Sequence, residues 1–184
     1  MTEPLPGHVV AVSRDDAHRF SKPTRESITL IAGIGVEGDA HAGATVQHLS
    51  RVRRDPTTPN LRQVHLIHSE LFDEVADRGH EVHPGALGEN ITTAGIDLLA
   101  LSRGTRLELG DDAVIEITGL RNPCTQINGL SEGLMKELVH LDDTGATVRL
   151  AGVMSVVLEG GVVRPGDGIR VIPPAGRFEP LQPV

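Results

Sequence analysis

The stretch TRLELGDDAVIEITGLRNPC, residues Thr105–Cys124, combines two strand-like runs with the only cysteine of the chain. The β-branched runs Thr105–Leu109 and Ala113–Thr118 flank the turn Gly110-Asp111-Asp112, where glycine supplies the positive φ of a tight connection. They predict an antiparallel hairpin whose second strand leads to Cys124. Apolar residues alternate only in part, which is typical of a curved sheet buried on much of both faces. A barrel is therefore favoured over a flat sheet.

Similar runs, bounded by glycine, proline or aspartate, occur along the whole chain. A second hairpin is predicted at Glu159-Gly160-Gly161. Helices are predicted over Ser69–Arg78, with Ser69 as N-cap and Gly79 as C-cap, and over about Ser131–His140. The expected fold class is mainly β, a closed or partly open β-barrel with a few short helices. The other expected strands are Val9–Val12, Ser27–Ala32, Gln63–His68, Val153–Leu158 and Ile169–Ile172.

A length of 184 residues suits one domain. We expect a single β-barrel domain over residues 1–172. The segment 173–184 contains four prolines and is expected to lie extended over the surface or to be partly disordered. The polar, basic segment Ser50–Asn60 contains Pro56 and Pro59 and is predicted to be a loop.

The composition argues against several classes of partner. The chain has 17 lysines and arginines against 25 acidic residues, a net charge of −8, which disfavours nucleic acid and anionic membranes. It has no Trp, no Tyr and three Phe, so platforms for stacking bases are scarce. Its first residues lack the features of a signal peptide, and no apolar stretch is long enough to span a membrane. We therefore expect a cytoplasmic protein.

Cys124 is the first candidate for chemistry, because it follows a predicted strand, where reactive groups often project. Pro123 fixes the backbone beside it, and Arg121 is placed to favour a thiolate. The alternative is that Cys124 is a small buried apolar residue.

The glycine-rich segment Gly33–Gly43 superficially resembles a dinucleotide-binding loop, but no helix and no βαβ unit follow it. We interpret it as a nest of backbone N–H groups flanked by Asp39 and His41, with a series of turns as the alternative. His41, His48 and Asp39 also suggest a mononuclear metal site, whereas His65 and His68 lie on opposite faces of a strand. Histidines that bind no metal are the alternative interpretation.

The loop Pro84–Asn90 places a carboxylate, Glu89, beside a carboxamide, Asn90, just before the strand-like Ile91-Thr92-Thr93. An Asx turn at Asn90 and simple solvent exposure of Glu89 explain the pair equally well.

Taken in order, these motifs resemble a MOSC domain, the family named for the C-terminal domain of molybdenum cofactor sulfurase. The resemblance covers about residues 7–172, and the ordered combination is far more specific than any one motif. The motifs are Gly38-Asp39-x-His41-x-Gly43, Arg62-Gln63-Val64-His65-Leu66, Pro84-Gly85-x-x-Gly88-Glu89-Asn90, a Gly-Asp turn and Arg121-x-Pro123-Cys124.

The resemblance implies a barrel related to that of pyruvate kinase, and a pocket for the molybdenum cofactor, molybdopterin. It implies that Cys124 is either a sulfur carrier or a molybdenum ligand, and that Cys124 and Arg121 are the catalytic residues. Arginine suits the phosphate and pterin carbonyls of the cofactor. The residues implied to bind the cofactor are Asp39, His41, Gly43, Arg62, Glu89 and Asn90.

The family includes proteins with a pyridoxal phosphate-dependent desulfurase domain, and no such segment, nor a ferredoxin-like or flavin domain, is present in these 184 residues. We therefore expect a cysteine desulfurase or an electron-transfer partner, the latter for reduction of an N-hydroxylated small molecule. Two other functions stay open. One is a metal hydrolase or oxygenase using His41, His48 and Asp39, and the other is a non-catalytic module that binds a pterin-like anion.

Overall fold

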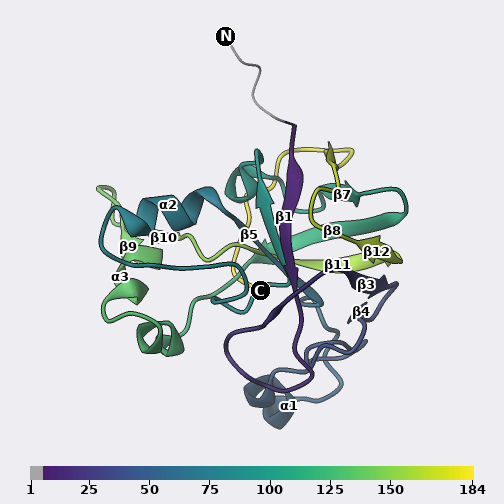
Figure 1. Ribbon diagram of the computed structural model, residues 1–184, viewed down its shortest axis with the longest axis horizontal. Coiled ribbons are helices and arrows are strands. Elements are labelled where there is room, and N and C mark those ends of the chain that lie inside the picture. Colours follow the sequence, from purple (N-terminus) through teal and green to yellow (C-terminus); the bar gives the residue numbers. More distant parts are fainter. Residues whose placement is uncertain (1–5) are drawn as a thin grey trace.

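The computed structural model describes residues 6–184, which form a mainly β molecule with three short α-helices in that range (Figure 1). The elements are β1 (His8–Ser13), β2 (Thr24–Arg25), β3 (Ile28–Ile31), β4 (Gly35–Val36), α1 (Leu49–Arg54), β5 (Val64–His68), α2 (Glu70–Ala76), β6 (Ile91–Ala94), η1 (Leu98–Ala100), β7 (Arg106–Leu109), β8 (Ala113–Leu120), η2 (Thr125–Gly129), α3 (Leu134–Leu138), β9 (Val139–Leu141), β10 (Thr147–Arg149), β11 (Val153–Glu159), β12 (Gly161–Val163) and β13 (Ile169–Ile172).

Eight strands form one mixed sheet in the order β13-β7-β8-β11-β5-β6-β1-β2. All neighbours in it are antiparallel except β5 and β6, which are parallel and joined through α2, since a parallel pair needs a crossover. The seven strands predicted from β-branched runs are all present within two residues of their predicted ends. The mainly β prediction is confirmed.

The sheet curls until its two ends approach each other. An isolated bridge joins His8 in β1 to Gly168, and the backbone N–H groups of Val9 and Ile169 donate to the carbonyls of Asp167 and Gly7. The sequence predicts a closed or partly open barrel. Among residues 6–184 no continuous ladder connects the end strands, so the closed form is not present and the curled sheet stays open at this seam.

One of the two predicted hairpins is confirmed. Strands β7 and β8 pair antiparallel across Gly110, whose φ is 62°. The predicted hairpin at Glu159-Gly160-Gly161 is wrong, because β12 pairs with β3 instead of with β11. Gly160 and Gly161 allow this change of partner, since a Cβ at either would press on backbone atoms of Leu30 or Ala113.

The helix predicted over Ser69–Arg78 is confirmed as α2, and Gly79 follows it with a φ of 90°. Ser69 is at the N-cap position, but its side chain makes no capping hydrogen bond. The second predicted helix is shorter than expected. Gly133 takes a φ of 83° just before α3, and the chain enters β9 directly after Leu138.

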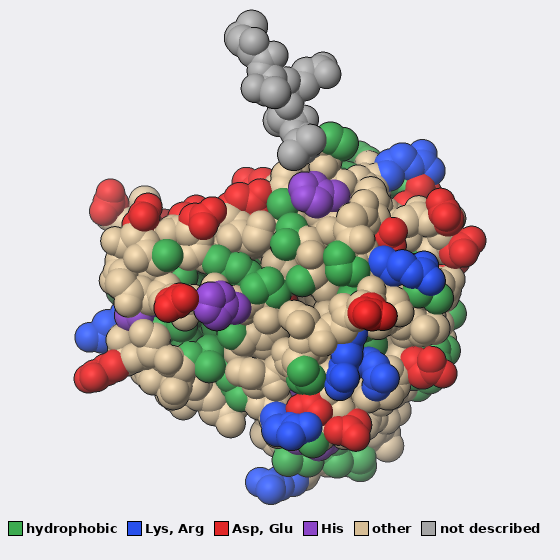
Figure 2. Space-filling view, in the orientation of Figure 1, with side chains coloured by type: hydrophobic (Ala, Val, Ile, Leu, Met, Phe, Trp, Pro, Cys, Tyr) green, Lys and Arg blue, Asp and Glu red, His purple; other side chains and the backbone are tan. Residues whose placement is uncertain are grey.

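The loop predicted over Ser50–Asn60 is wrong at its start, where α1 forms. Proline cannot continue a helix, but Pro56 comes after α1 has ended. The helix belongs to the segment 44–60, called the flap below, which projects at the lower end of Figure 1. Two backbone hydrogen bonds close its base: the N–H of Val46 donates to Thr58, and that of Asn60 donates to Ala44. Several basic side chains gather at this end in Figure 2, whereas carboxylates dominate the edges to the left and right.

Two apolar clusters hold the molecule together. The larger lies inside the curled sheet and includes Leu66, Leu107, Ile115 and Val153. The smaller packs α2, α3 and η2 against the end of β5 and includes Ile67, Leu71, Val75, Ile127 and Leu134. Strand β5 alternates between them, because Leu66 faces the first cluster and Ile67 the second.

The segment 173–184 lies extended against the sheet. The Ser102 hydroxyl accepts a hydrogen bond from the N–H of Glu179, Leu181 is buried, and the N–H of Val184 donates to the carbonyl of Leu120. None of the helices within residues 6–184 combines the length and the apolar character needed to cross a membrane.

Candidate functional site

A cavity of about 260 Å³ lies where β8 ends, between β5, the flap and the segment that connects β1 to β2. It gathers side chains from six stretches that are distant in the sequence. The residues that line it are His18, Arg19, Phe20, Lys22, His41, His48, Leu49, Ser50, Arg62, His65, Gly88, Asn90, Arg121, Cys124, Gln126 and Met154.

Cys124 reaches this cavity from the N-cap position of η2. Pro123 before it is buried, and Ile127 after it anchors η2 in the smaller apolar cluster. The thiol itself is half-buried, with Sγ 3.6 Å from the Oε1 of Gln126. The cysteine is therefore held by its neighbours while its sulfur stays accessible.

Arg121 lines the cavity and is only 9% exposed. Lys22 is buried more deeply but is paired with Asp39, whereas Arg121 has no ion-pair partner among the described residues. Its guanidinium lies over the ring of Phe20, 5.5 Å from the ring centre. Within residues 6–184 no group hydrogen-bonds to its Nη1, although this atom is sealed from solvent. Burial lowers the pKa of Arg121, and the neighbouring Cys124 and Glu89 oppose that effect. A buried charged donor without a partner is costly, so this position suits an anionic ligand.

Arg62 contributes a second cation to the same cavity. Its Nε is buried and makes no hydrogen bond to any part of the chain that the structure describes. Burial and the nearby charges of Arg51 and Arg121 lower the pKa of Arg62 to about 10, so the guanidinium stays charged at neutral pH. Two cations that repel each other across a cavity favour an anion between them.

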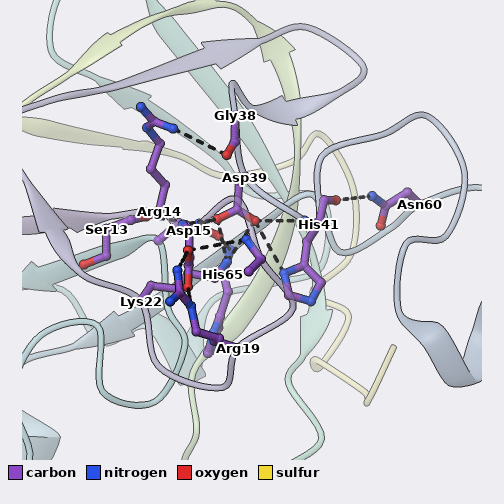
Figure 3. A network of polar contacts seen from close by, with 12 residues as sticks. Ser13, Arg14, Asp15, Arg19, Lys22, Gly38, Asp39, His41, Asn60 and His65 are labelled. Atoms are coloured by element: carbon purple, nitrogen blue, oxygen red, sulfur yellow. Dashed lines mark hydrogen bonds and ion pairs between the residues drawn. The ribbon is translucent and has the colours of Figure 1, made fainter.

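Asp39 lies beneath the cavity wall and holds several segments together (Figure 3). Its carboxylate is 2.9 Å from the Nζ of Lys22 and accepts hydrogen bonds from the backbone of Asp15 and His41 and from the Nδ2 of Asn90. Burial alone would raise the pKa of Asp39, but these bonds and the Lys22 charge hold it well below the usual range. Since both its oxygens are occupied, Asp39 positions its neighbours.

Three histidine rings form one wall of the site. His41 lies edge-on to His18, with ring centres 5.3 Å apart, and its ring centre is 5.0 Å from that of His48. Its Nδ1 is 3.4 Å from an oxygen of Asp39. Across residues 6–184, however, no three side chains of His, Cys, Asp or Glu are grouped so as to hold a metal ion. Among the described residues His41, His48 and Asp39 therefore do not form a set of metal ligands, and the hypothesis of a mononuclear metal site has no support from the structure.

His65 reaches the cavity from β5, opposite Met154 in the adjacent strand. It is 4% exposed, and its Nε2 lies 2.7 Å from the carbonyl oxygen of Ala151. Burial, reinforced by the charge of Arg121, lowers the pKa of His65 well below the usual value. The imidazole is therefore neutral. His68, on the other face of β5, does not line the cavity.

Three residues that the resemblance implied to bind the cofactor, Asp39, Glu89 and Gly43, lie outside the cavity lining. Glu89 is fully buried, and its Oε1 accepts hydrogen bonds from the backbone of Gly85 and from the hydroxyl of Thr92. Gly43 contacts Asn60, whose Nδ2 donates to its carbonyl. Asn90 lines the cavity, but its amide also ties Ser13 and Asp39 to β5.

The glycine-rich loop does not present a free nest of N–H groups at Asp39–Gly43. The N–H groups of Asp39, Ala40, Ala42 and Gly43 all donate to backbone carbonyls, and that of His41 donates to the Asp39 side chain. The loop therefore serves to place Asp39 and His41.

Sequence reasoning missed the segment Asp15–Lys22, which supplies His18, Phe20 and Lys22 to the site. A signal was present, because one of only three phenylalanines in the chain occurs there among charged residues. In the structure Arg19 makes two hydrogen bonds to Asp15, of 2.5 and 2.6 Å, which fold this segment over the cavity.

Comparisons with known proteins agree with this architecture. A family model described as MOSC domain matches residues 39–170. The chain is similar to the YuaD protein from Bacillus subtilis, with a TM-score of 0.72, 22% identity and coverage of 93% of this chain and 98% of that one. It is also similar to YiiM from Geobacillus stearothermophilus, with a TM-score of 0.62, 17% identity and coverage of 91% of this chain and 75% of that one. For YiiM from Escherichia coli the TM-score is 0.61 and the identity 20%, with coverage of 96% of this chain and 74% of that one. At these identities the likeness shows a common fold. No curated protein sequence matches the chain.

Proposed function

The chain belongs to the MOSC domain family, which is generally associated with binding of the molybdenum cofactor, and on that premise we propose that its cavity binds a molybdopterin-type cofactor beside Cys124. The observation that carries the proposal is the pair of buried, unpartnered guanidinium nitrogens, Arg121 Nη1 and Arg62 Nε, in the one cavity that also contains the thiol. Neither nitrogen has a hydrogen-bond partner within residues 6–184.

The donor set fits such a group. Guanidinium groups bind phosphate through paired, charge-assisted hydrogen bonds, and a cofactor phosphate would satisfy both arginines. A thiolate is a soft ligand of the kind that transition metals such as molybdenum accept. When bound, the cofactor supplies a redox-active metal. Arg121 and Arg62 would hold its anionic part, and Cys124 would face the metal.

The chain's other residues keep this arrangement in place. Lys22 and Asp39 form a buried ion pair that fixes the segment above the cavity relative to the loop that carries His41. The ring of Phe20 covers one side of Arg121 and keeps water from that face. The site is therefore organised before any ligand enters, which strengthens binding.

Cys124 has two candidate roles in this proposal. As a metal ligand it would remain a thiolate while an N-hydroxylated substrate is reduced with electrons from a partner protein. As a sulfur carrier, its thiolate would attack the outer sulfur of a donor's persulfide, so that the donor's thiolate leaves and Cys124 holds the new persulfide. A cysteine desulfurase is the class of donor that this step requires.

The test compares protein from a host that makes the molybdenum cofactor with protein from a host that cannot. Molybdenum is measured by elemental analysis, pterin by fluorescence after extraction, and Cys124 persulfide by intact mass. We expect molybdenum and pterin together in the first host alone. Arg121→Gln should lower the loaded fraction at least about tenfold, because it removes a charge-assisted contact.

The matched control is Arg164→Gln, which changes an exposed arginine outside the cavity and should leave loading unchanged. Protein from the competent host without molybdenum and pterin would refute the proposal. Loading that is unaffected by Cys124→Ser would instead favour a non-catalytic module that binds a pterin-like anion.

A further inference from the structure

The hydrogen-bonding state of His65 follows from its geometry. Its Nε2 lies 2.7 Å from the carbonyl oxygen of Ala151, and a carbonyl can only accept, so Nε2 carries the proton. In a neutral imidazole the other nitrogen, Nδ1, is then an acceptor. The charged groups that act on this ring are Arg121, Lys22 and Arg62, all cations, and together with burial they keep it neutral.

The acceptor has no partner in the chain as far as the structure describes it. The amide of Asn90, which bonds to the backbone of His65, is already used: its Oδ1 accepts from the backbone N–H of His65, and its Nδ2 donates to Ser13 and Asp39. Nδ1 of His65 therefore stays available to a ligand in the cavity that its ring lines.

Two arginines that line the same cavity keep hydrogen-bond donors without partners. Arg121, which is 9% exposed, leaves Nη1 without a partner, and Arg62 leaves Nε without one, counting all groups in residues 6–184. The cavity therefore places the neutral acceptor of His65 together with the charges of two arginines, and both Arg121 and His65 are more than nine-tenths buried.

We infer that His65 makes the cavity selective for an anionic group that carries an N–H or O–H donor of its own. The arginines bind the negative charge, and Nδ1 of His65 accepts the hydrogen of the ligand. An anion without such a hydrogen would turn an oxygen lone pair toward the lone pair of Nδ1. A buried acceptor left unpaired in this way lowers affinity markedly.

Phosphate and sulfate are the probes that test this selectivity. Near neutral pH phosphate keeps at least one O–H, whereas sulfate has none, and the two have nearly the same size and shape. With the cofactor-free full chain, isothermal titration calorimetry at constant ionic strength should show phosphate binding about tenfold or more tighter than sulfate. Equal affinities, or no phosphate binding at millimolar concentration, would overturn the inference.

Three variants assign the effect to His65. His65→Phe should abolish the preference while sulfate binding changes little, and Arg121→Gln should weaken both anions. His68→Phe, a control on the other face of β5, should keep the preference of the unchanged protein. A preference that survives in His65→Phe contradicts the inference.

A measurement without any substitution guards against variants that fail to fold. Long-range correlations between ring protons and nitrogens in NMR spectra should show His65 as the neutral tautomer with the proton on Nε2 at pH 7. A proton on Nδ1, or a charged ring, would overturn the inference.

The anion titration and the NMR measurement do not depend on the cofactor, so selectivity can hold even where the proposed function fails. A separate measurement of pterin content identifies which ligand carries the donor hydrogen. If the hydrogen belongs to the cofactor, His65→Phe lowers the pterin content of protein from the competent host. If it belongs to a separate substrate, pterin content is unchanged while anion selectivity is lost. Both results support the inference.

Discussion

Lys22 and Arg121 are two buried cations of the same cavity wall with different surroundings. Lys22 is 2.9 Å from Asp39 and is compensated within the protein. Arg121 has an aromatic ring on one face and leaves Nη1 without a hydrogen bond among the described residues. The first cation therefore stabilises the fold, and the second is available to a ligand.

This difference predicts unequal effects of substitution on stability. Lys22→Met should lower the free energy of unfolding by about 3–5 kcal/mol, because it leaves the Asp39 carboxylate buried without its cation. The exposed ion pair between Arg170 and Glu108 provides the control, where Arg170→Met should change stability by less than about 1 kcal/mol. Urea denaturation measures both. Similar effects of the two substitutions would show that the buried pair is not a structural contact.

Cys124→Ser should have little effect on stability, with a change below about 1 kcal/mol. The thiol is half-buried and already lies near the Oε1 of Gln126, to which a serine hydroxyl can donate. Ile127→Ala, in the short helix that follows Cys124, should lower the free energy of unfolding by about 2–5 kcal/mol, because Ile127 is fully buried. This variant is the control that shows the measurement can detect a loss of packing. A large loss of stability in Cys124→Ser would favour a packing role for the cysteine.

At the scale of elements, the start of β11 depends on Gly152. This residue has a φ of 85°, and a Cβ there would collide with the carbonyl oxygen of Leu66 in β5. The preceding Ala151 offers its carbonyl to His65, and Gly152 itself accepts a hydrogen bond from the backbone of Arg121. Ala151 and Gly152 together therefore connect the start of β11 to β5 and to the residue that follows β8.

Gly152→Ala should destabilise the protein far more than Gly145→Ala. Both glycines have left-handed φ values, of 85° and 82°, but nothing lies within 4 Å of a Cβ at Gly145. Gly145→Ala should therefore show only the strain of the left-handed backbone, about 1–2 kcal/mol. Thermal unfolding compares the two variants. Equal shifts in melting temperature would mean that β5 moves freely to accept a Cβ.

Helix α1 shows how an element can form without a core. It buries none of its side chains and carries Arg51, Arg53 and Arg54. Its polar sequence with two following prolines is typical of a loop, and the backbone hydrogen bonds at the base of the flap are contacts that a local pattern does not contain. The flap nevertheless borders the cavity through Leu49 and Ser50.

For the whole molecule, the buried histidine makes stability depend on pH. Burial lowers the pKa of His65 in the folded state, whereas the unfolded chain takes up its proton near pH 6.5. The unfolded state therefore binds more protons below that pH, and stability falls as the pH falls, by up to about 1.4 kcal/mol per pH unit for one group. Asp39, whose folded pKa is also lowered, adds to the loss only below about pH 4.

Denaturation between pH 7 and pH 4.5 measures this dependence. His65→Gln should reduce the slope by about one proton, since glutamine does not titrate. A slope that is unchanged in His65→Gln would mean that other groups cause the acid sensitivity.

The strands could be predicted from the sequence because each depends on a local pattern. The runs at Val64–His68, Ala113–Leu120 and Val153–Glu159 are rich in β-branched residues and end at glycine, proline or polar residues, which suffices to locate a strand. Their partners could not be predicted in the same way. Strand β12 follows β11 after a single glycine yet pairs with β3, because pairing depends on which backbones meet in three dimensions.

The sequence by itself determined the mainly β character, the family resemblance and the candidates Cys124, Arg121, His41 and Asn90, since residue type and spacing carry that information. Only the tertiary structure decided which of them share a cavity and which polar atoms there are already hydrogen-bonded. Asp39 and Glu89 look equally available in the sequence, yet both oxygens of Asp39 and the Oε1 of Glu89 are engaged with Lys22, Gly85 and neighbouring groups, while Arg121 keeps its Nη1 without a partner among the described residues. The physical reason is that burial and hydrogen-bond partners come from segments far apart along the chain.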